Sequence, residues 1–506
     1  MPQLAHDAAE NSEVEVSSSN ALTFVRILAL TALFSVAAVY EAIHVSAILA
    51  PGVWVHLRTG LWTLQNHAVP HSGLFSQFPH LLWDDASWSF DLVLGLAYRT
   101  FGLRAIPLLL MLLKVAFAAT TFLLARAGKA DFWSAVVLSA AAQYVISGLQ
   151  PLPYAFSILF FAVELILLVS SRDTGWPHSL YWLPLLFLVW ANVDIQFVFG
   201  LVLLLVYLIV LGIEDLIRRA GKSWMSERIR SVALRRAGIA ALLSLLATFA
   251  TPYTVHLLPN SFSRLYGHAL FEYFSEMSAM SFRHPQEFVL MLLVMAGFLS
   301  LGRRRALDLF GLLTLVAGTA IAFRVQRDGW LAVLPAIAII PEGLQQREPL
   351  LKMTKRQAMS AAALTAVTVI CAALSLPRNP VLMNKIDQVY PVKACDYIRN
   401  NRLPQPLFNA DSWGSFLTWY LPQYQVAVDS RVELYGDHLF QSYFDVVSGK
   451  QLLETDSRVS PTGTLLLERQ SAMAKALTNL PLLEAKYKLV YSDDLASVFV
   501  GRAGDQ

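Results

Sequence analysis

The stretch that decides the fold runs from Ala50 to Asp91 and reads APGVWVHLRTGLWTLQNHAVPHSGLFSQFPHLLWDDASWSFD. It follows the first long apolar run of the chain, and it is rich in tryptophan, histidine, proline and acidic residues. A segment that only tethers two membrane-spanning helices needs few such side chains. We therefore expect this segment to carry groups that bind ligands or transfer protons, and the search for a functional site starts there.

The rest of the chain has the composition of a membrane protein. Of its 506 residues, 56% are hydrophobic and 15% are charged, whereas a soluble domain is about 45–50% apolar and about 25% charged. Apolar runs of about 17–25 residues predict transmembrane helices. We expect a mainly α, polytopic bundle of about eleven spans, at residues 22–48, 104–126, 131–148, 152–171, 178–192, 196–214, 237–252, 285–302, 306–323, 328–345 and 358–376.

Basic residues indicate how this bundle is oriented, because cytoplasmic loops carry an excess of lysine and arginine. Such residues gather in four segments, at 126–129, 218–236, 303–305 and 352–356. All four lie on one side of the membrane if the N-terminus is cytoplasmic and the loop 49–103 is outside. This orientation makes Trp88–Gly102 a juxtamembrane helix rather than a span. It also leaves residues 1–21 as a polar tail that we expect to be disordered.

The composition changes after the last apolar run, and no later run is long enough to span a bilayer. We therefore expect the transmembrane domain to occupy residues 22–376 and an extracytoplasmic α/β domain to occupy residues 377–506. Helical patterns are predicted at Val392–Asn400, Trp413–Leu421, Gly436–Val447 and Ser471–Leu480. Short β-rich runs are predicted at Gln425–Val428, Thr464–Leu467, Lys488–Tyr491 and Ser497–Val500.

Charged side chains gather at the outer ends of the predicted spans. Each is a functional candidate, because a charge at membrane depth is costly unless it faces a cavity or a partner. The set comprises His56, Arg58, Asp84, Asp85, Asp91, Asp194, Glu276, Arg324 and Arg327. Arginine binds phosphate through paired hydrogen bonds, and a carboxylate can take the proton from an attacking hydroxyl. The combination suits chemistry on a lipid-linked phosphate at the outer membrane surface.

Simpler explanations exist for parts of this set. Four tryptophans of the first loop are also typical of an interfacial aromatic belt: Trp54, Trp62, Trp83 and Trp88. Asp84 and Asp85 could form a solvated turn or a helix cap, and Arg324 and Arg327 could flank a span and reach the interface. A metal site at His67 and His71 is disfavoured because Pro70 lies between them.

Several segments, taken in order, resemble bacterial integral-membrane glycosyltransferases of the GT-C fold. In the first loop they are GVWVHLRTGLWTL (52–64), HAVPHSGLFS (67–76) and WDDASWSFD (83–91). Further along they are LQPLPYAFS (149–157), WANVD (190–194), TPYTVHLLP (251–259) and AFRVQRD (322–328). The outer domain contributes FNADSWGSFLTWYLP (408–422), VAVDSRVELYGDHLFQSYFDVVSG (426–449) and YKLVYSDDLASVFVGR (487–502). Together they touch most of the chain.

The resemblance implies a multi-pass protein of the bacterial inner membrane whose C-terminal domain is periplasmic. It implies transfer of a sugar from a polyprenyl-phosphate donor to a glycan, lipid or protein acceptor, with inversion, and no nucleic-acid partner. The general base would be Asp85, Asp84 or Asp91. Substrate would be bound by His56, Arg58, Asp194, Glu276, Arg324 and Arg327. No cofactor is implied with certainty, and a divalent cation is left open without support.

The chain also departs from the family pattern. Ala50 and Gly52 stand where the family often has two acids, and Ala86 and Ser87 replace a histidine and a glutamate. These departures motivate a second hypothesis, a catalytically degenerate GT-C-like scaffold or lipid-glycan binding subunit of an envelope assembly complex. A secondary transporter is a third hypothesis, disfavoured because the sequence has no inverted repeat.

Overall fold

The structure is a computed structural model. It describes residues 2–174, 177–219, 234–259, 261, 275–304, 306–343, 354–450 and 463–501. Most of the basic segment 218–236, and part of the segment 352–356, lie outside the described residues.

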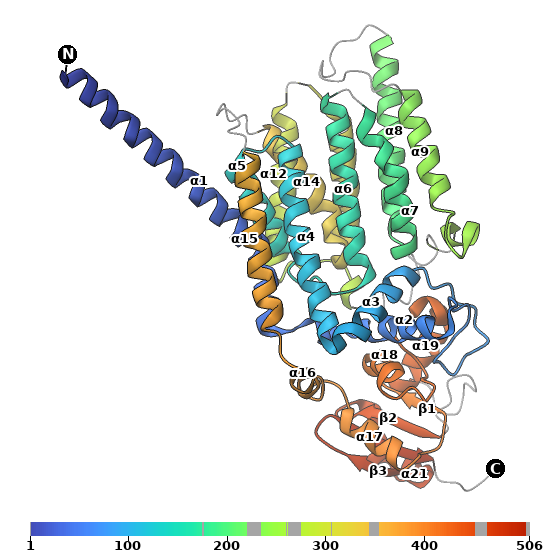
Figure 1. Cartoon of the computed structure of the whole chain (residues 1–506). Coiled ribbons are helices and arrows are strands. Elements are labelled where there is room, and N and C mark those ends of the chain that lie inside the picture. Colours follow the sequence, from blue (N-terminus) through green and yellow to red (C-terminus); the bar gives the residue numbers. More distant parts are fainter. Residues whose placement is uncertain are drawn as a thin grey trace.

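A bundle of helices forms the larger part of the molecule (Figure 1). Each predicted span coincides with a helix: α1 (Pro2–His44), α4 (Ala105–Ala127), α5 (Phe132–Val145), α6 (Pro153–Thr174), α7 (Leu183–Val193), α8 (Phe197–Arg219), α9 (Leu234–Ala247), α12 (Pro285–Arg303), α13 (Leu309–Arg324), α14 (Trp330–Gly343) and α15 (Lys355–Leu374). Among the described residues, six helices are long and apolar enough to cross a membrane, and α5, α7 and α13 are shorter apolar helices. The chain is a multi-pass membrane protein, and the number of eleven crossings stays a prediction.

Helix α1 begins earlier than we expected. It begins at Pro2, and the disorder expected for the polar tail stays a prediction. No glycine or proline follows Pro2 within this helix, and these are the residues that break helices most strongly. The membrane-length apolar part remains Leu22–His44.

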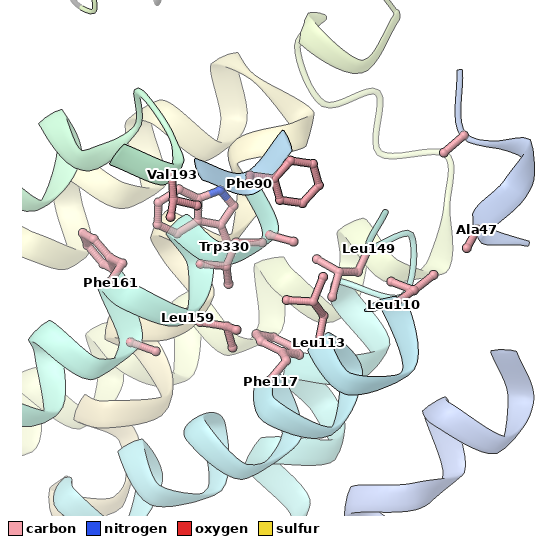
Figure 2. Packing of buried hydrophobic residues seen from close by; sticks show 14 of the residues in the cluster. Ala47, Phe90, Leu110, Leu113, Phe117, Leu149, Leu159, Phe161, Val193 and Trp330 are labelled. Carbon is pink, nitrogen blue, oxygen red and sulfur yellow. The ribbon is translucent and has the colours of Figure 1, made fainter. Parts of the chain in front are cut away.

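The core of the bundle is apolar and centred on α14, whose residues from Trp330 to Pro341 are buried. Figure 2 shows Trp330 among Leu159 and Phe161 of α6 and Phe117 of α4. A helix that is apolar on all sides is expected to be surrounded by other helices. In contrast, α15 packs along α1 at the edge of the bundle and leaves most of its side chains exposed.

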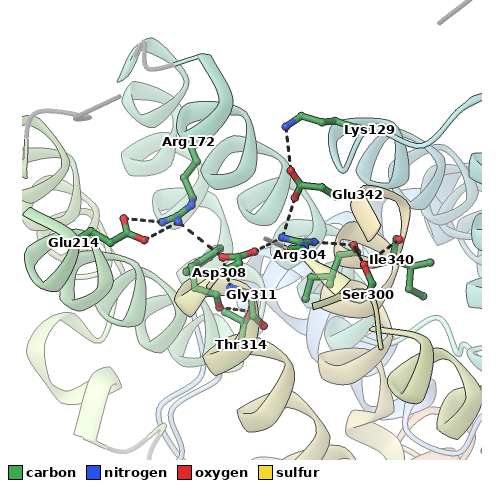
Figure 3. Close-up of polar contacts among 12 residues, drawn as sticks. Lys129, Arg172, Glu214, Ser300, Arg304, Asp308, Gly311, Thr314, Ile340 and Glu342 are labelled. Atoms are coloured by element: carbon green, nitrogen blue, oxygen red, sulfur yellow. Dashed lines mark hydrogen bonds and ion pairs between the residues drawn. The ribbon is translucent and has the colours of Figure 1, made fainter. Parts of the chain in front are cut away.

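The bundle end remote from the C-terminal domain, here called the far end, carries a network of six charged side chains (Figure 3). It consists of Lys129, Arg172, Glu214, Arg304, Asp308 and Glu342. Arg172 of α6 lies 2.9 Å from Glu214 of α8. Arg304, which follows α12, lies 2.8 Å from Glu342 at the end of α14. The network therefore ties the far ends of several helices to one another.

Two short helices cover the opposite end of the bundle, here called the near end. Figure 1 shows α2 (Val53–Asn66) and α3 (Trp88–Phe101) between the bundle and the C-terminal domain. Their backbones approach closely at Gly60 and Gly95: a Cβ atom on Gly60 would lie 1.9 Å from the carbonyl oxygen of Asp91. Only glycine permits this approach.

The C-terminal domain packs directly against α2. Trp54 of α2 is fully buried and stacks on Trp419 of α18 (Asp411–Tyr420), with ring centroids 4.6 Å apart. The alternative that Trp54 belongs to an interfacial belt is therefore wrong, because the outer domain covers it.

The domain itself has a four-stranded sheet in the order β1-β2-β4-β3. The strands are β1 (Leu407–Asn409), β2 (Thr464–Glu468), β3 (Tyr487–Ser492) and β4 (Ala496–Gly501). β1 pairs in parallel with β2, and the other two pairs are antiparallel. Its other helices are α16 (Asn379–Ile386), α17 (Val392–Asn400), α19 (Val432–Val447), α20 (Ala472–Asn479) and α21 (Pro481–Lys486). The run Gln425–Val428, which we predicted as a strand, is not one. The strand that pairs with β2 is β1, which we did not predict.

Residues 72–83, here called the strap, belong to the loop 49–103 and pair with this domain. Ser76 forms a parallel β-bridge with Val426, and Val426 also bridges to Leu407 of β1. The Gln77 amide group donates a hydrogen bond to the Leu407 carbonyl oxygen. The backbone of Val426 thus pairs with the strap, although the segment around Val426 forms no strand. The strap fixes the outer domain over the near end.

Candidate active site

A cavity of about 420 Å³ lies where the near end, α2 and the C-terminal domain meet. Five of the nine predicted site residues line it: His56, Asp85, Asp194, Glu276 and Arg327. They come from α2, the loop before α3, the loop after α7, the 3-10 turn Ser275–Met277 and the 3-10 turn Gln326–Gly329. The sequence separates these residues by up to 271 positions, from His56 to Arg327. The structure brings them to one cavity.

A sixth predicted residue, Asp91, supports this cavity from behind. Its Oδ1 atom lies 2.7 Å from Nδ1 of His56, and its side chain is 1% exposed. With Asp91 ionised, its carboxylate only accepts hydrogen bonds and the contact places the imidazole proton on Nδ1, although burial raises the pKa of Asp91 well above 3.8. The pKa of His56 is lowered by burial, against the opposing effect of the nearby Asp85. The neutral form of the ring is therefore favoured.

Asp85 lies on the cavity wall in a buried turn. Its Oδ1 atom accepts a hydrogen bond from the Ser87 amide at 3.2 Å, but the turn is buried and not solvated as the alternative had it. The Asp85 amide donates to the hydroxyl of Tyr253, which belongs to the segment 251–259. Burial raises the pKa of Asp85 well above 3.8, and the neighbouring Asp91 raises it further. Both effects shift the equilibrium of its carboxyl group toward the protonated form.

Asp194 follows the end of α7 and accepts a hydrogen bond from the hydroxyl of Ser157. The indole of Trp190 donates to that same hydroxyl oxygen at 2.7 Å. Burial raises the pKa of Asp194 to about 6, although the Ser157 hydrogen bond and the charge of Arg327 act in the opposite direction. Asp194 is therefore held by a fixed polar chain in the cavity wall.

Arg327 lies at the junction with a second cavity of about 600 Å³, which Gln150, Tyr154 and Glu276 also line. The Nε atom of Arg327 is 3.6 Å from Asp328, and its guanidinium carbon is 5.9 Å from the Tyr154 ring centroid. The second cavity is also lined by apolar side chains from α5, α6, α12 and α14. Arg327 thus lies where the two cavities meet, and both cavities have walls of mixed polar and apolar side chains.

Three predicted residues lie elsewhere. Arg58 stacks over the ring of Phe75 in the strap, with 5.0 Å from its guanidinium carbon to the ring centroid. Asp84 is half-buried, Arg324 is exposed at the end of α13, and neither lines the two cavities described above. Arg324 and Arg327 are separated because the helix ends between them and the chain turns at Val325.

The outer domain contributes cavity residues that sequence reasoning did not single out. Arg431 forms two hydrogen bonds with Asp429, at 2.9 and 2.6 Å, and Tyr435 donates a third to Asp429 at 2.9 Å. Arg431 also donates to the carbonyl oxygen of Leu74 in the strap. Both Arg431 and Asp429 line the cavity. They lie in the segment 426–449, which carries the family resemblance, and that was the available signal.

Acidic groups outnumber basic ones around the cavity, yet their arrangement does not suggest a metal centre. Among the residues that the structure describes, no cluster of three or more histidine, cysteine, aspartate or glutamate side chains is placed to hold a metal ion. The described lining instead combines two arginines, one histidine and several carboxyls.

Comparisons with known proteins agree on the fold. No protein-family model matches the sequence, and no curated protein sequence matches it significantly. The oligosaccharyltransferase of Archaeoglobus fulgidus tethered to an acceptor peptide is similar, with a TM-score of 0.52 and 13% identity over 94% of this chain and 74% of that chain. The same enzyme, AglB, in complex with an inhibitory peptide and a dolichol-phosphate gives a TM-score of 0.54 and 12% identity over 94% and 74%.

A third structure, ArnT from Cupriavidus metallidurans bound to undecaprenyl phosphate, gives a TM-score of 0.49 and 13% identity over 94% of this chain and 99% of that chain. The likeness to the oligosaccharyltransferase extends over nearly the whole chain, including the C-terminal domain. The chain therefore has a GT-C-like membrane glycosyltransferase fold, as the sequence resemblance predicted.

Proposed function

We propose that this protein transfers a sugar from a polyprenyl-phosphate donor to an acceptor hydroxyl in the cavity at the near end. One observation carries the proposal: a guanidinium, an imidazole and three carboxyls from five separate segments line a single cavity. The acceptor would be an envelope glycan, a lipid or a protein, and the reaction would take place on the extracytoplasmic side of the inner membrane.

The position of Arg327 supports a lipid-linked donor. The polyprenyl chain would enter the second cavity, where apolar residues such as Ile158 and Leu290 form part of the wall. The donor phosphate would then lie beside Arg327, at the junction of the two cavities. A guanidinium pairs well with phosphate oxygens, and it would stabilise the negative charge that grows on the leaving phosphate. The archaeal neighbour was solved with dolichol-phosphate, which is a ligand of this kind.

The polar cavity supplies the remaining chemistry. The acceptor oxygen would attack the anomeric carbon from the face opposite the phosphate, so that the bond from that carbon to the phosphate oxygen breaks and the configuration inverts. The acceptor proton must pass to a base on the cavity wall. Of the three carboxyls that we predicted as base, Asp85 lines this cavity, whereas Asp84 and Asp91 do not.

A transfer assay tests the proposal. Purified full-length protein in lipid would be given radiolabelled polyprenyl-phosphate sugars and an extract of envelope acceptors. We expect Arg327→Gln to lower kcat/KM about 10- to 100-fold, because a charge-assisted contact to the donor is lost. Arg324→Gln is the matched control, since Arg324 lies three residues away and lines neither cavity. Equal activity of wild type and Arg327→Gln would overturn the proposed donor site.

A second candidate is the catalytically degenerate scaffold or lipid-glycan binding subunit. The observation that favours it is that Ala86 and Ser87, which replace a histidine and a glutamate of the family pattern, themselves line the cavity. This candidate predicts that the wild-type protein binds undecaprenyl phosphate in an Arg327-dependent manner without transferring sugar. Turnover by the wild-type protein would exclude it.

A further inference from the structure

We infer that His56 is the catalytic residue that takes the proton from the acceptor, and that Asp91 is its positioning residue. The inference rests on the proposed function and deepens it, because it replaces the expected carboxylate base with a histidine–aspartate pair. Sequence reasoning assigned His56 to substrate binding and Asp91 to the base. The structure joins the two side chains in one hydrogen bond of 2.7 Å.

The backbone positions this pair. His56 lies one helical turn before Gly60 on α2, and Asp91 lies one turn before Gly95 on α3. Residues four apart share a helix face, so the contact between the two glycines brings both polar side chains together. A Cβ atom on Gly95 would lie 2.8 Å from the Gly60 carbonyl carbon, so neither glycine can be replaced without separating the helices.

The geometry leaves one ring nitrogen of His56 available to a substrate. Nδ1 is engaged by Asp91, and His56 lines the cavity. The ring packs edge-on against Phe90, with centroids 5.3 Å apart, which further restricts its rotation. With the proton on Nδ1, Nε2 has a free lone pair and is a proton acceptor. A buried aspartate that fixes the tautomer of a histidine base is a known arrangement in nucleophilic catalysis.

Asp85 is the competing base, and its surroundings argue against it. Its Oδ1 atom already accepts the Ser87 amide, and burial raises the pKa of Asp85 well above 3.8, as it does the pKa of Asp91; an Asp85 that holds a proton cannot take the acceptor proton. Burial instead lowers the pKa of His56. The charged groups that face His56 are Asp85 from the loop before α3, Asp194 from the loop after α7, and Glu433 and Arg431 from the outer domain. The three acids raise the pKa of His56, but the effect of burial is larger.

The step balances without any co-reactant. The acceptor O–H proton moves to Nε2 of His56 while the acceptor oxygen bonds to the anomeric carbon and the polyprenyl phosphate leaves. The imidazolium is stabilised by Asp91 and then releases its proton to water. The products are the glycosylated acceptor, polyprenyl phosphate and one proton.

Kinetics of His56→Asn test the inference, because asparagine can still donate to Asp91 but has no acceptor at the Nε2 position. We expect kcat to fall about 100- to 10,000-fold, with the dissociation constant for undecaprenyl phosphate changed less than about threefold. The wild-type kcat should decline at acid pH with a midpoint below 6.5, and this decline should be absent in His56→Asn. His67→Asn, on an exposed histidine at the end of the same helix, is the matched control.

Asp91→Asn should lower kcat at least about 100-fold and move the acid midpoint, whereas a purely structural role would lower the amount of folded protein without moving it. Asp85→Asn should cost about tenfold or less. Full activity of His56→Asn, or a loss confined to Asp85→Asn, would overturn the inference.

A readout that does not need turnover separates this inference from the proposed function. Diethyl pyrocarbonate modifies neutral imidazole nitrogens, and mass spectrometry can follow its reaction with His56 as the pH is varied. We expect His56 to react with an apparent pKa below 6.5 that shifts in Asp91→Asn. An unreactive His56 overturns the inference even if transfer is observed. A reactive His56 in a wild-type protein that transfers no sugar overturns the proposed function alone.

Discussion

The two ends of the helix bundle differ in how their charged side chains are paired. At the far end, each of the six charged side chains of the network has an opposite charge within 4 Å, as between Arg172 and Glu214. At the near end, the side chains of Asp85 and Asp91 lie beside each other and share a hydrogen bond, and Nη1 of Arg431 has no hydrogen-bond partner among the described residues.

Buried polar atoms are normally paired, and exceptions call for an explanation. The far end uses its charges to hold helices together, whereas the near end gathers carboxyls that outnumber the basic groups around the cavity. We infer that the charges of the far end serve stability, and the proposed function assigns the carboxyls of the near end to chemistry. Substitutions at the two ends should therefore change different quantities.

The largest expected effect on stability is at the far end. Arg172→Met leaves the buried Glu214 carboxylate without the arginine 2.9 Å away, and breaking a buried ion pair from one side costs about 3–5 kcal/mol. Thermal unfolding in detergent would measure the loss. The double variant Arg172→Met/Glu214→Leu should recover most of it, because no charge is then left unpaired. A single variant as stable as wild type would contradict the view of the far end as a clamp.

The next effect has the opposite sign and lies in the cavity. The pKa of Asp194 is about 6 in the folded protein against an ordinary value of 3.8. The folded state therefore binds more protons than the unfolded state between these values, and the free energy of unfolding should fall as the pH rises from about 4 to about 6. Asp194→Asn removes this dependence and should stabilise the protein by about 3 kcal/mol at pH 8.

Unfolding at pH 4 is the control for Asp194→Asn. Near that pH the folded wild-type protein already carries a neutral Asp194, so the two proteins should differ little. The prediction would be contradicted if the free energy of unfolding of the wild-type protein rose from pH 4 to pH 6 and that of Asp194→Asn did not. Folding would then favour the charged form of Asp194.

A smaller effect is expected at the junction of the two cavities. Arg327 contacts Asp328 at 3.6 Å and is partly exposed, so Arg327→Gln should change the free energy of unfolding by less than about 1 kcal/mol while donor use is lost. Thermal unfolding and the transfer assay on the same preparation would give both numbers. A large loss of stability would mean that Arg327 has a structural role, like the charged residues of the far end.

The smallest effect is at the exposed edge of the far-end network. Lys129 lies 3.5 Å from Glu342, and its side chain is 36% exposed. An ion pair of this kind contributes about 0–1 kcal/mol, so Lys129→Ala should unfold almost as wild type does. A loss comparable to that of Arg172→Met would mean that the network acts as one unit rather than as separate pairs.

Much of the fold followed from local patterns. The apolar runs predicted the position of every bundle helix, because a segment that crosses lipid must be continuously apolar whichever helices it packs against. The convergence of Asp85, Asp194, Glu276 and Arg327 followed from topology, which puts the loops that carry them at the same end of the bundle. These features depend on periodicity and connectivity, and both can be read from the chain.

What the sequence did not reveal depends on contacts between distant segments. The partnership of His56 with Asp91 requires the close approach of two helices at Gly60, and no periodic pattern predicts it. Arg324 and Arg327 differ in position only because a helix ends between them. Arg431 and Asp429 line the cavity because the C-terminal domain packs against α2. No local sequence pattern in that domain predicts this packing.

The strap has a consequence for how the molecule is made. Its contact between Trp83 and Glu433 joins residues 350 positions apart, and loop closure over such a distance is slow. During synthesis the first external loop is finished long before the outer domain that it must pair with. The ribosome therefore completes and inserts nearly the whole bundle while the cavity still lacks a wall. Assembly of the site is the last event of biogenesis, so a chain that stops short of the outer domain would enter the membrane without a finished site.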